Sequence, residues 1–320
     1  MMSSHSARPD LAAVFVWSHE YFCEAAGRQP CDLASNGCVM RCAVSGAVGV
    51  GAGVACNLGE VAKNAVAMAR ITHADPRCAA GVAFVTTLVH QLIRWRVAHA
   101  HTHAAPAITK PSSDAVEAMI AASLAVAIST MADELQCCAE RVAEVVATLP
   151  EKMAAPAAPY LPDQRAQGPQ IEAGWTAANT AAVRAARWSS GELERYVAAT
   201  TIEELNLSGE GDGFRGNGIG YAFIPVGCAV VSLRALCRSA GPVDYHEAIH
   251  LIMSEGGDAD TNATVAGAVL GAAVGASGLP KHLVEQLKYR EWLTDRTTEF
   301  VQAACLGGAP AVEGGVGGGH

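Results

Sequence analysis

Apolar positions recur at helical spacing along most of the chain. Leu11, Val14, Phe15 and Phe22 share one helix face, and Gly27 is typical of a helix end. The same spacing predicts further helices over residues 57–71, 76–100, 113–149, 244–255, 261–276 and 280–303. No stretch alternates with period two for long enough to predict a sheet. The pattern therefore predicts an all-α fold.

Residues at the predicted helix ends support these boundaries. Asp75 followed by Pro76 is a favourable pair for an N-cap and a first helical turn. Ser113 is a candidate N-cap for the long helix that follows it. Asp244 and Glu247 have the spacing of a capping box. The helix starts are therefore expected close to these residues.

Two connecting segments interrupt the helical pattern. Residues 101–112 are rich in His, Ala and Pro, and residues 150–174 contain five prolines, which exclude regular structure. The glycine-rich residues 306–320 are predicted to be a disordered tail. No internal repeat is found. We therefore predict a compact single-domain helical bundle over residues 1–305, with two long surface loops.

Composition narrows the class of protein further. Apolar residues make up 51% of the chain but aromatic residues only 5%, and Ala and Gly carry much of the apolar fraction. This balance favours closely packed helices over an aromatic-rich β sandwich. The formal net charge is −9 and no basic cluster occurs, which argues against nucleic acid as a partner.

The cysteines and hydropathy predict a cellular compartment. The chain has 11 cysteines, an odd number, with no C-x-x-C pair, so buried thiols in a reducing compartment are expected. No secretory leader is recognised at the start of the sequence. Residues 263–278 are rich in Ala and Gly and only weakly hydrophobic, and no run of 18 strongly apolar residues is identified. A cytoplasmic protein without a membrane partner is expected.

The strongest candidate for chemistry is the stretch "SEGGDADTNATVAGAVLGAAVG", residues 254–275. A turn at its glycines would let Asp258 and Asp260 point the same way, with the Thr261 hydroxyl as a third oxygen. Such hard oxygen donors suit Mg²⁺, Mn²⁺ or Ca²⁺. An EF-hand is excluded, because its sixth and twelfth positions would be Ala263 and Val269. The alternative is that one aspartate merely caps the helix.

The residues after these acids predict an inner helix. Gly267, Gly271 and Gly275 recur every four positions, so one helix face would carry no side chains. Neighbouring helices could then approach the backbone closely and bury this helix at the centre of the bundle. Carboxylates at the end of a buried helix need a cation or hydrogen-bond donors.

Four segments, in order, resemble the ADP-ribosylglycohydrolase family. "GGDADTNATVAGAVLGAAVG" is similar to the family's C-terminal signature. "SNGCVMRCA", residues 35–43, resembles its Ser-Asn-Gly-x-x-Met-Arg segment, and "ARITHADPR", residues 69–77, its Thr-His-x-x-Pro segment. "GNGIGYAFIPVGCAVVSL", residues 216–233, is similar to the helix start that precedes the metal motif. The resemblance spans roughly residues 10–303.

The resemblance implies an all-α hydrolase with a binuclear Mg²⁺ or Mn²⁺ centre, which cleaves the bond between ADP-ribose and a protein side chain or a small conjugate. It implies three metal ligands, namely Asp258, Asp260 and Thr261, of which Asp258 is also a possible catalytic residue. It implies a substrate pocket formed by Ser35, Asn36, Gly37, His73, Gly218 and Tyr221. Ribose hydroxyls are oxygens that such ions bind readily.

Each transferred residue also has a structural interpretation. Ser35 can be the N-cap of the helix that runs through Met40, and His73 can order a turn at a helix end. For Arg41 the structural interpretation is favoured. Tyr221 is as consistent with core packing as with stacking on a nucleotide.

The match is incomplete at the N-terminus. The family has a second acidic metal motif, of Thr-Asp-Asp-Thr type, and a catalytic acid upstream of the Ser-Asn-Gly segment. In this sequence 34 residues precede Ser35, and their acids, none adjacent to another, are Asp10, Glu20, Glu24 and Asp32. The chain is then an N-terminally truncated enzyme, a member that binds ADP-ribose without cleaving it, or an enzyme in which another acid has moved into the site. Only one of the two metal sites would be retained.

Overall fold

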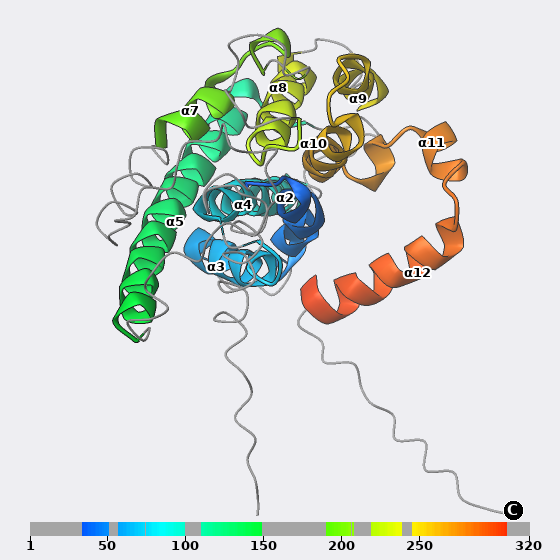
Figure 1. The fold of residues 1–320 in the computed structure, drawn as a ribbon. Coiled ribbons are helices and arrows are strands. Elements are labelled where there is room, and N and C mark those ends of the chain that lie inside the picture. The colour runs from blue at the N-terminus through cyan, green and yellow to red at the C-terminus, as the bar shows by residue number, and fades with distance from the viewer. Residues whose placement is uncertain are drawn as a thin grey trace, which may run out of the picture.

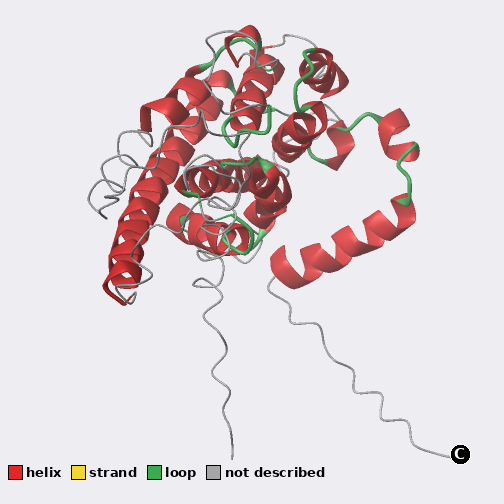
Figure 2. Cartoon of the chain, viewed as in Figure 1, coloured by secondary structure: helices red, strands yellow, loops and turns green. Residues whose placement is uncertain are grey.

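The computed structural model describes residues 34–50, 57–73, 75–99, 110–148, 190–205, 207, 219–238 and 245–305. In these residues the backbone forms helices, turns and a single isolated β-bridge, with no strand (Figure 2). The predicted all-α fold is confirmed. The expected helix over 11–27, most of the loop 101–112, the segment 150–174 and the tail 306–320 lie outside the described residues.

The helices follow the predicted order with several additions (Figure 1). The elements are α2 (Gly37–Cys42), η1 (Ala43–Ala47), α3 (Leu58–Ala69), α4 (Pro76–His99), α5 (Ser113–Thr148), α7 (Ser190–Ala198), η2 (Glu203–Leu205), α8 (Ile224–Arg238), α9 (Tyr245–Ser254), α10 (Ala259–Val274), η3 (Ala276–Gly278), α11 (Lys281–Glu285), α12 (Arg290–Phe300) and η4 (Val301–Cys305).

Helix α4 lies at the centre of the bundle. Every residue from 76 to 90 is buried, because α3, α5, α10 and the α2–η1 segment all pack around it. Most of these buried side chains are small or apolar, with Arg77, Thr86, Thr87 and His90 as the polar ones, and burial on all sides is typical of a helix that is surrounded by others. Helix α10 packs against α4, α8 and α9, but its glycine positions are only partly buried and α4 takes the centre, so the predicted central position of this helix is wrong.

The glycines of α10 do not form one continuous packing face. A Cβ atom at Gly267 would lie 2.9 Å from the hydroxyl oxygen of Tyr245 in α9, so the backbones do approach closely there. At Gly271 nothing lies within 4 Å of such an atom. Gly275, with φ of 66°, ends the helix beneath the side chain of Arg96. The prediction of close packing along the whole face is therefore wrong.

Several predicted helix ends are also corrected. Helix α10 begins at Ala259, so Asp260 and Thr261 lie in its first turn. The N–H of Ala115 donates to the Ser112 hydroxyl at 3.2 Å, so the residue that caps α5 is Ser112 and not Ser113. The predicted helix over 280–303 breaks between α11 and α12, where Tyr289 has φ of 61°.

Helix α5 contains a segment that the sequence analysis did not recognise as strongly apolar. Ser113–Gln136 is long and apolar enough to cross a membrane by length and composition, with a mean hydropathy of 1.8. The expectation that no such run occurs is therefore wrong. Its buried residues Val116, Ile120, Ala127 and Met131 follow one helix face, and the helix packs against α4. The segment is 28% buried, and a single helix of this kind is weak evidence for a membrane span.

Candidate functional site

A short antiparallel bridge joins two segments that the sequence analysis had singled out. Ser35 pairs with Tyr221, and the backbone N–H of Asn36 donates to the carbonyl of Gly220 at 2.8 Å. Asn36 is the N-cap residue of α2, although its side chain does not cap that helix. The structural interpretation of Ser35 as an N-cap is therefore wrong by one residue.

The side chain of Asn36 instead reaches the metal motif. Its Nδ2 donates to Oδ2 of Asp258 at 2.7 Å. Asn36 is buried, with an exposed fraction of 5%, and Asp258 is half-buried. Asp258 occupies the N-cap position of α10 but makes no capping hydrogen bond with its side chain. Its carboxylate is therefore held by Asn36 and not by the start of the helix.

Asp260 lies next to Asp258 on the exposed side. Its Oδ1 accepts the backbone N–H of Thr261 at 2.9 Å. The pKa of Asp260 is lowered, first by a hydrogen bond with the Asp258 carboxyl group and second by the Thr261 N–H. The two carboxyl groups therefore lie close together at the first turn of α10, with the buried side chain of Thr261 beside them.

The next residue, Asn262, was not singled out in the sequence. Its side chain is fully buried, and neither Oδ1 nor Nδ2 has a hydrogen-bond partner among the described residues. Leaving such a polar group without a partner costs about 1–3 kcal/mol. In the sequence Asn262 is an amide in the first turn of the predicted helix 261–276, but its burial follows only from the packing of α10 against the neighbouring helices.

His73 lies over the Ser-Asn-Gly segment. A Cβ atom at Gly37 would lie 3.7 Å from Nε2 of His73, so the imidazole ring faces the backbone of Gly37. Nδ1 of His73 is 2.7 Å from the Thr72 hydroxyl, and the ring is half-buried. Ser35, at the same place, is exposed. The structure therefore brings His73 to the segment that includes Ser35, Asn36 and Gly37.

Arg77 and Asp75 form a buried ion pair at the start of α4. Nη2 of Arg77 donates to Oδ2 of Asp75 at 2.8 Å, and Oδ1 of Asp75 accepts the Arg77 backbone N–H at 2.9 Å, at the start of α4. Burial is the largest single influence and acts to lower the pKa of Arg77, but the charge and hydrogen bond of Asp75, together with the nearby Tyr221 and Glu192, raise this pKa by more, so the net direction is upward. From the sequence Asp75 is recognisable only as an N-cap, because a spacing of two residues does not show that its side chain meets that of Arg77.

Tyr221 belongs to the core. It is 1% exposed and packs edge-on against Phe223, with ring centroids 5.3 Å apart. The guanidinium carbon of Arg77 lies 5.6 Å from the Tyr221 ring centroid. Burial is the main cause that raises the pKa of Tyr221, so its phenol stays protonated. These contacts favour core packing of this side chain over stacking on a ligand.

Two further residues complete the comparison with the sequence. Arg41 donates to the backbone carbonyl of Ala69 at 3.1 Å, near the C-terminal end of α3, where a cation is favourable. This contact fits the structural role that the sequence favoured. Gly218 lies outside the described residues.

The oxygen donors of Asp258, Asp260 and Thr261 fit a hard divalent cation by their chemistry. Oδ2 of Asp258 accepts the hydrogen bond from Asn36, and the Asp258 carboxyl group also contacts that of Asp260. The described part of the chain contains no group of three His, Cys, Asp or Glu side chains that could hold an ion. The four acids that precede Ser35 lie outside that part.

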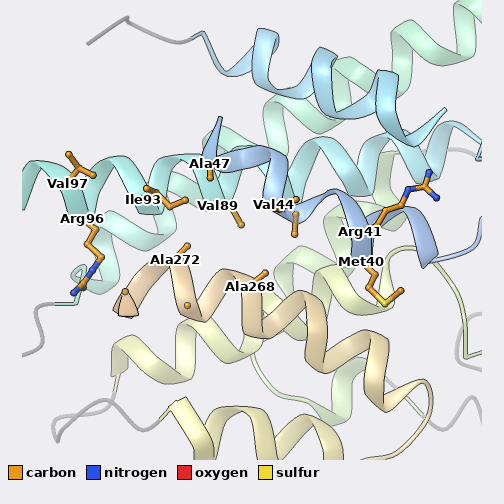
Figure 3. Close-up of a pocket in the computed structure, with 13 residues that line it drawn as sticks. Met40, Arg41, Val44, Ala47, Val89, Ile93, Arg96, Val97, Ala268 and Ala272 are labelled. Carbon is orange, nitrogen blue, oxygen red and sulfur yellow. The ribbon is translucent and has the colours of Figure 1, made fainter. Parts of the chain in front are cut away.

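A separate cavity of about 660 Å³ lies between η1, α4 and α10 (Figure 3). Its walls are apolar, with the guanidinium groups of Arg41 and Arg96 towards opposite ends. The aspartates and His73 do not line it. Apolar walls provide no ligands for a hard cation, so we place the candidate site at the N-terminal end of α10 and not in this cavity.

Comparison with known proteins gives one match. A family model described as ADP-ribosylglycohydrolase matches residues 10–309, nearly the whole chain. No curated protein and no solved structure matches the chain.

Proposed function

The chain belongs to the ADP-ribosylglycohydrolase family, and we propose that it is a metal-dependent hydrolase that releases ADP-ribose from a modified protein side chain or from a small ADP-ribose conjugate. Membership suggests the hydrolase type. The metal and the substrate are our proposal, and they rest on the chemistry of the site at the start of α10.

One observation carries the proposal. The hydrogen bond between Asn36 and Asp258 joins residues 222 positions apart, one from the Ser-Asn-Gly segment and one from the acidic motif. A purely structural role would be served by an Asp258 side chain that caps α10, and this side chain does not do so. A buried amide that holds a carboxylate in place is typical of sites where that carboxylate must be oriented for a ligand.

Mg²⁺ or Mn²⁺ would be held by Asp258, Asp260 and the hydroxyl of Thr261. When bound, the ion supplies positive charge that binds ribose hydroxyls and orients the attack of water on the anomeric carbon. The donors that we can assign belong to one ion, which corresponds to half of the binuclear centre of the family.

The chain's own residues would shape the rest of the site. The hydrogen bond from Asn36 fixes one oxygen of the Asp258 carboxylate, and this also sets the direction in which the other oxygen points. Gly37 carries no side chain beneath the His73 ring, so the imidazole lies close to the backbone of the Ser-Asn-Gly segment. The exposed hydroxyl of Ser35 and the imidazole of His73 would donate or accept hydrogen bonds at the ribose and phosphate groups.

Thermal unfolding tests the metal site. Mg²⁺ should raise the Tm of the wild-type chain, and both Asp258→Ala and Asp260→Ala should abolish this rise. Asp114→Ala is the matched control, because Asp114 also lies in the first turn of a helix, α5, but outside the site. If neither site variant changes the response to Mg²⁺ or to ADP-ribose, the assignment is wrong.

A second candidate function is binding of ADP-ribose without hydrolysis. It is favoured by the presence of only two carboxylates at the site in the part of the chain that the structure describes. Release of ADP-ribose from a modified protein, measured with and without Mg²⁺, separates the two. An enzyme releases ADP-ribose in a metal-dependent way, whereas a binding protein shows ADP-ribose-dependent stabilisation and no release.

A further inference from the structure

The peptide group between Ser35 and Asn36 is held on both sides. Its N–H donates to the carbonyl oxygen of Gly220 at 2.8 Å. Its carbonyl oxygen, which belongs to Ser35, accepts hydrogen bonds from two thiols, that of Cys78 at 3.2 Å and that of Cys38 at 3.5 Å. Because a peptide group is planar, these contacts fix the plane from which the Asn36 side chain extends. The direction of that side chain therefore depends on the two thiols.

The two thiols come from different helices. Cys38 lies in the first turn of α2, and Cys78 lies in the first turn of α4, two residues after Pro76. Both residues have an exposed fraction of 0%. The sulfur atom of Cys38 also lies 4.0 Å from the carbonyl oxygen of Cys78, and the two thiols are hydrogen-bonded to each other. The Ser-Asn-Gly segment is therefore attached through them to α4, the helix at the centre of the bundle.

The thiols can donate because they stay protonated. A hydrogen bond with Cys38 and, after it, burial raise the pKa of Cys78 well above its ordinary value. A thiol carries one proton and a carbonyl oxygen has two lone pairs, so Ser35 can accept from both cysteines at once. Each S–H···O contact is weak. The shorter contact, from Cys78, is expected to contribute more than the one from Cys38.

We propose that Cys38 and Cys78 are positioning residues, whose thiols hold the Ser35 carbonyl so that the Asn36 amide meets the carboxylate of Asp258. This rests on the proposed function, because it makes the affinity of that carboxylate for Mg²⁺ depend on two groups that touch neither metal nor substrate. A cysteine without such a role only fills space in the core, as small buried cysteines commonly do. Serine separates the two roles, since its hydroxyl keeps a donor but not an apolar surface.

Isothermal titration of the full chain with Mg²⁺ tests this role. The double variant Cys38→Ala/Cys78→Ala should bind Mg²⁺ about 10-fold more weakly, at the lower end of the range for loss of an outer partner of a metal ligand. Cys38→Ser/Cys78→Ser should retain most of the wild-type affinity, because its hydroxyls still donate to Ser35. Equal affinities of the wild type and the alanine double variant, or weaker binding by the serine than by the alanine double variant, would overturn the proposal.

Cys228→Ala is the matched control. Cys228 is also a fully buried thiol, but it lies in α8, and among the described residues no hydrogen bond joins it to the Ser-Asn-Gly segment. This variant should bind Mg²⁺ as the wild type does. A loss of affinity equal to that of the alanine double variant would show that any cavity in the core weakens the site, and would overturn the proposal.

A second measurement needs no metal. The coupling between Asn36→Ala and Asp258→Ala in urea denaturation should become smaller in the alanine double variant and stay unchanged in the serine double variant. A wild-type chain that does not bind Mg²⁺, but whose coupling falls with the thiols, would refute the proposed metal site and support the positioning role. A coupling that is unchanged without the thiols would overturn the positioning role, whether or not Mg²⁺ binds.

Discussion

The side-chain amide of Asn36 donates a 2.7 Å hydrogen bond to the carboxylate of Asp258. It connects the N-terminus of α2 to the N-terminus of α10, two helices that pack on each other and on α4. Because Asn36 is buried and Asp258 half-buried, this charge-assisted bond is only partly exposed to water. The position of the carboxylate therefore depends on the Ser-Asn-Gly segment.

A double-mutant cycle measures this dependence. Asn36→Ala and Asp258→Ala should be coupled by about 1.5–3 kcal/mol in the free energy of unfolding, since the bond involves a charged acceptor. Urea denaturation of the two single variants and the double variant gives the coupling energy. Strict additivity of the two changes would mean that the bond does not persist in solution.

An added side chain should cost more stability at one glycine of the turn before Asp258 than at the other. Gly256 and Gly257 have φ of 76° and 66°, so alanine at either should cost about 1–2 kcal/mol for the left-handed backbone. At Gly257 a Cβ atom would also overlap the carbonyl oxygen of Leu207, whereas at Gly256 nothing lies within 4 Å. Gly257→Ala should therefore cost about 1–3 kcal/mol more than Gly256→Ala. Urea denaturation compares the pair, and equal costs would contradict the contact with Leu207.

Two glycines inside α10 should respond in opposite directions. Gly271→Ala should stabilise the chain by about 0.5–1 kcal/mol, because alanine is the better helix former and the added methyl group meets nothing within 4 Å. At Gly267 the methyl group must displace the hydroxyl of Tyr245, 2.9 Å away, so Gly267→Ala should be less stable than Gly271→Ala by at least about 1 kcal/mol. The two Tm values decide this. The reverse order would show that this helix packs differently.

The ion pair of Arg77 and Asp75 should be costly to break. The side chains are 6% and 0% exposed, so Arg77→Met leaves a buried carboxylate without its partner, at a cost of about 3–5 kcal/mol. Arg296→Met is the control, because Arg296 pairs with Glu299 at 55% and 57% exposure and such pairs contribute at most about 1 kcal/mol. Similar unfolding free energies for the two variants would be inconsistent with a buried pair.

Stability should fall in mild acid because of His90. Burial lowers the pKa of His90, whose Nδ1 contacts the carbonyl oxygen of Gly46 at 2.9 Å. A histidine with a lowered pKa binds fewer protons when folded than when unfolded, so this contribution is complete above pH 6.5 and is lost as the pH falls towards the folded value. Urea midpoints at pH 7.5 and 5.5 should therefore differ more for the wild type than for His90→Asn. An unchanged difference would exclude His90 as the cause.

The sequence predicts a helix boundary best where residues next to that boundary determine it. Helix α4 begins where Asp75 and Pro76 place it, because an N-cap and a first-turn proline act within a few residues. The break between α11 and α12 was missed because the turn there, ending at Tyr289, contains neither glycine nor proline. The caps of α2 and α5 were each misplaced by one residue, since neighbouring polar residues compete for the same role.

The sequence by itself determined that the chain is helical and that two carboxylates stand at the start of α10, because helical periodicity and the residue types at a helix start act within a few turns. Only the tertiary structure decided that Asn36 holds Asp258, that His73 covers Gly37 and that Arg77 and Tyr221 pack together in the core. These contacts join distant positions and depend on how the helices pack around α4. The spacing of residues along the chain does not show which distant side chains meet. The two aspartates could therefore be recognised from the sequence, whereas the contact by which Asn36 orients Asp258 could not.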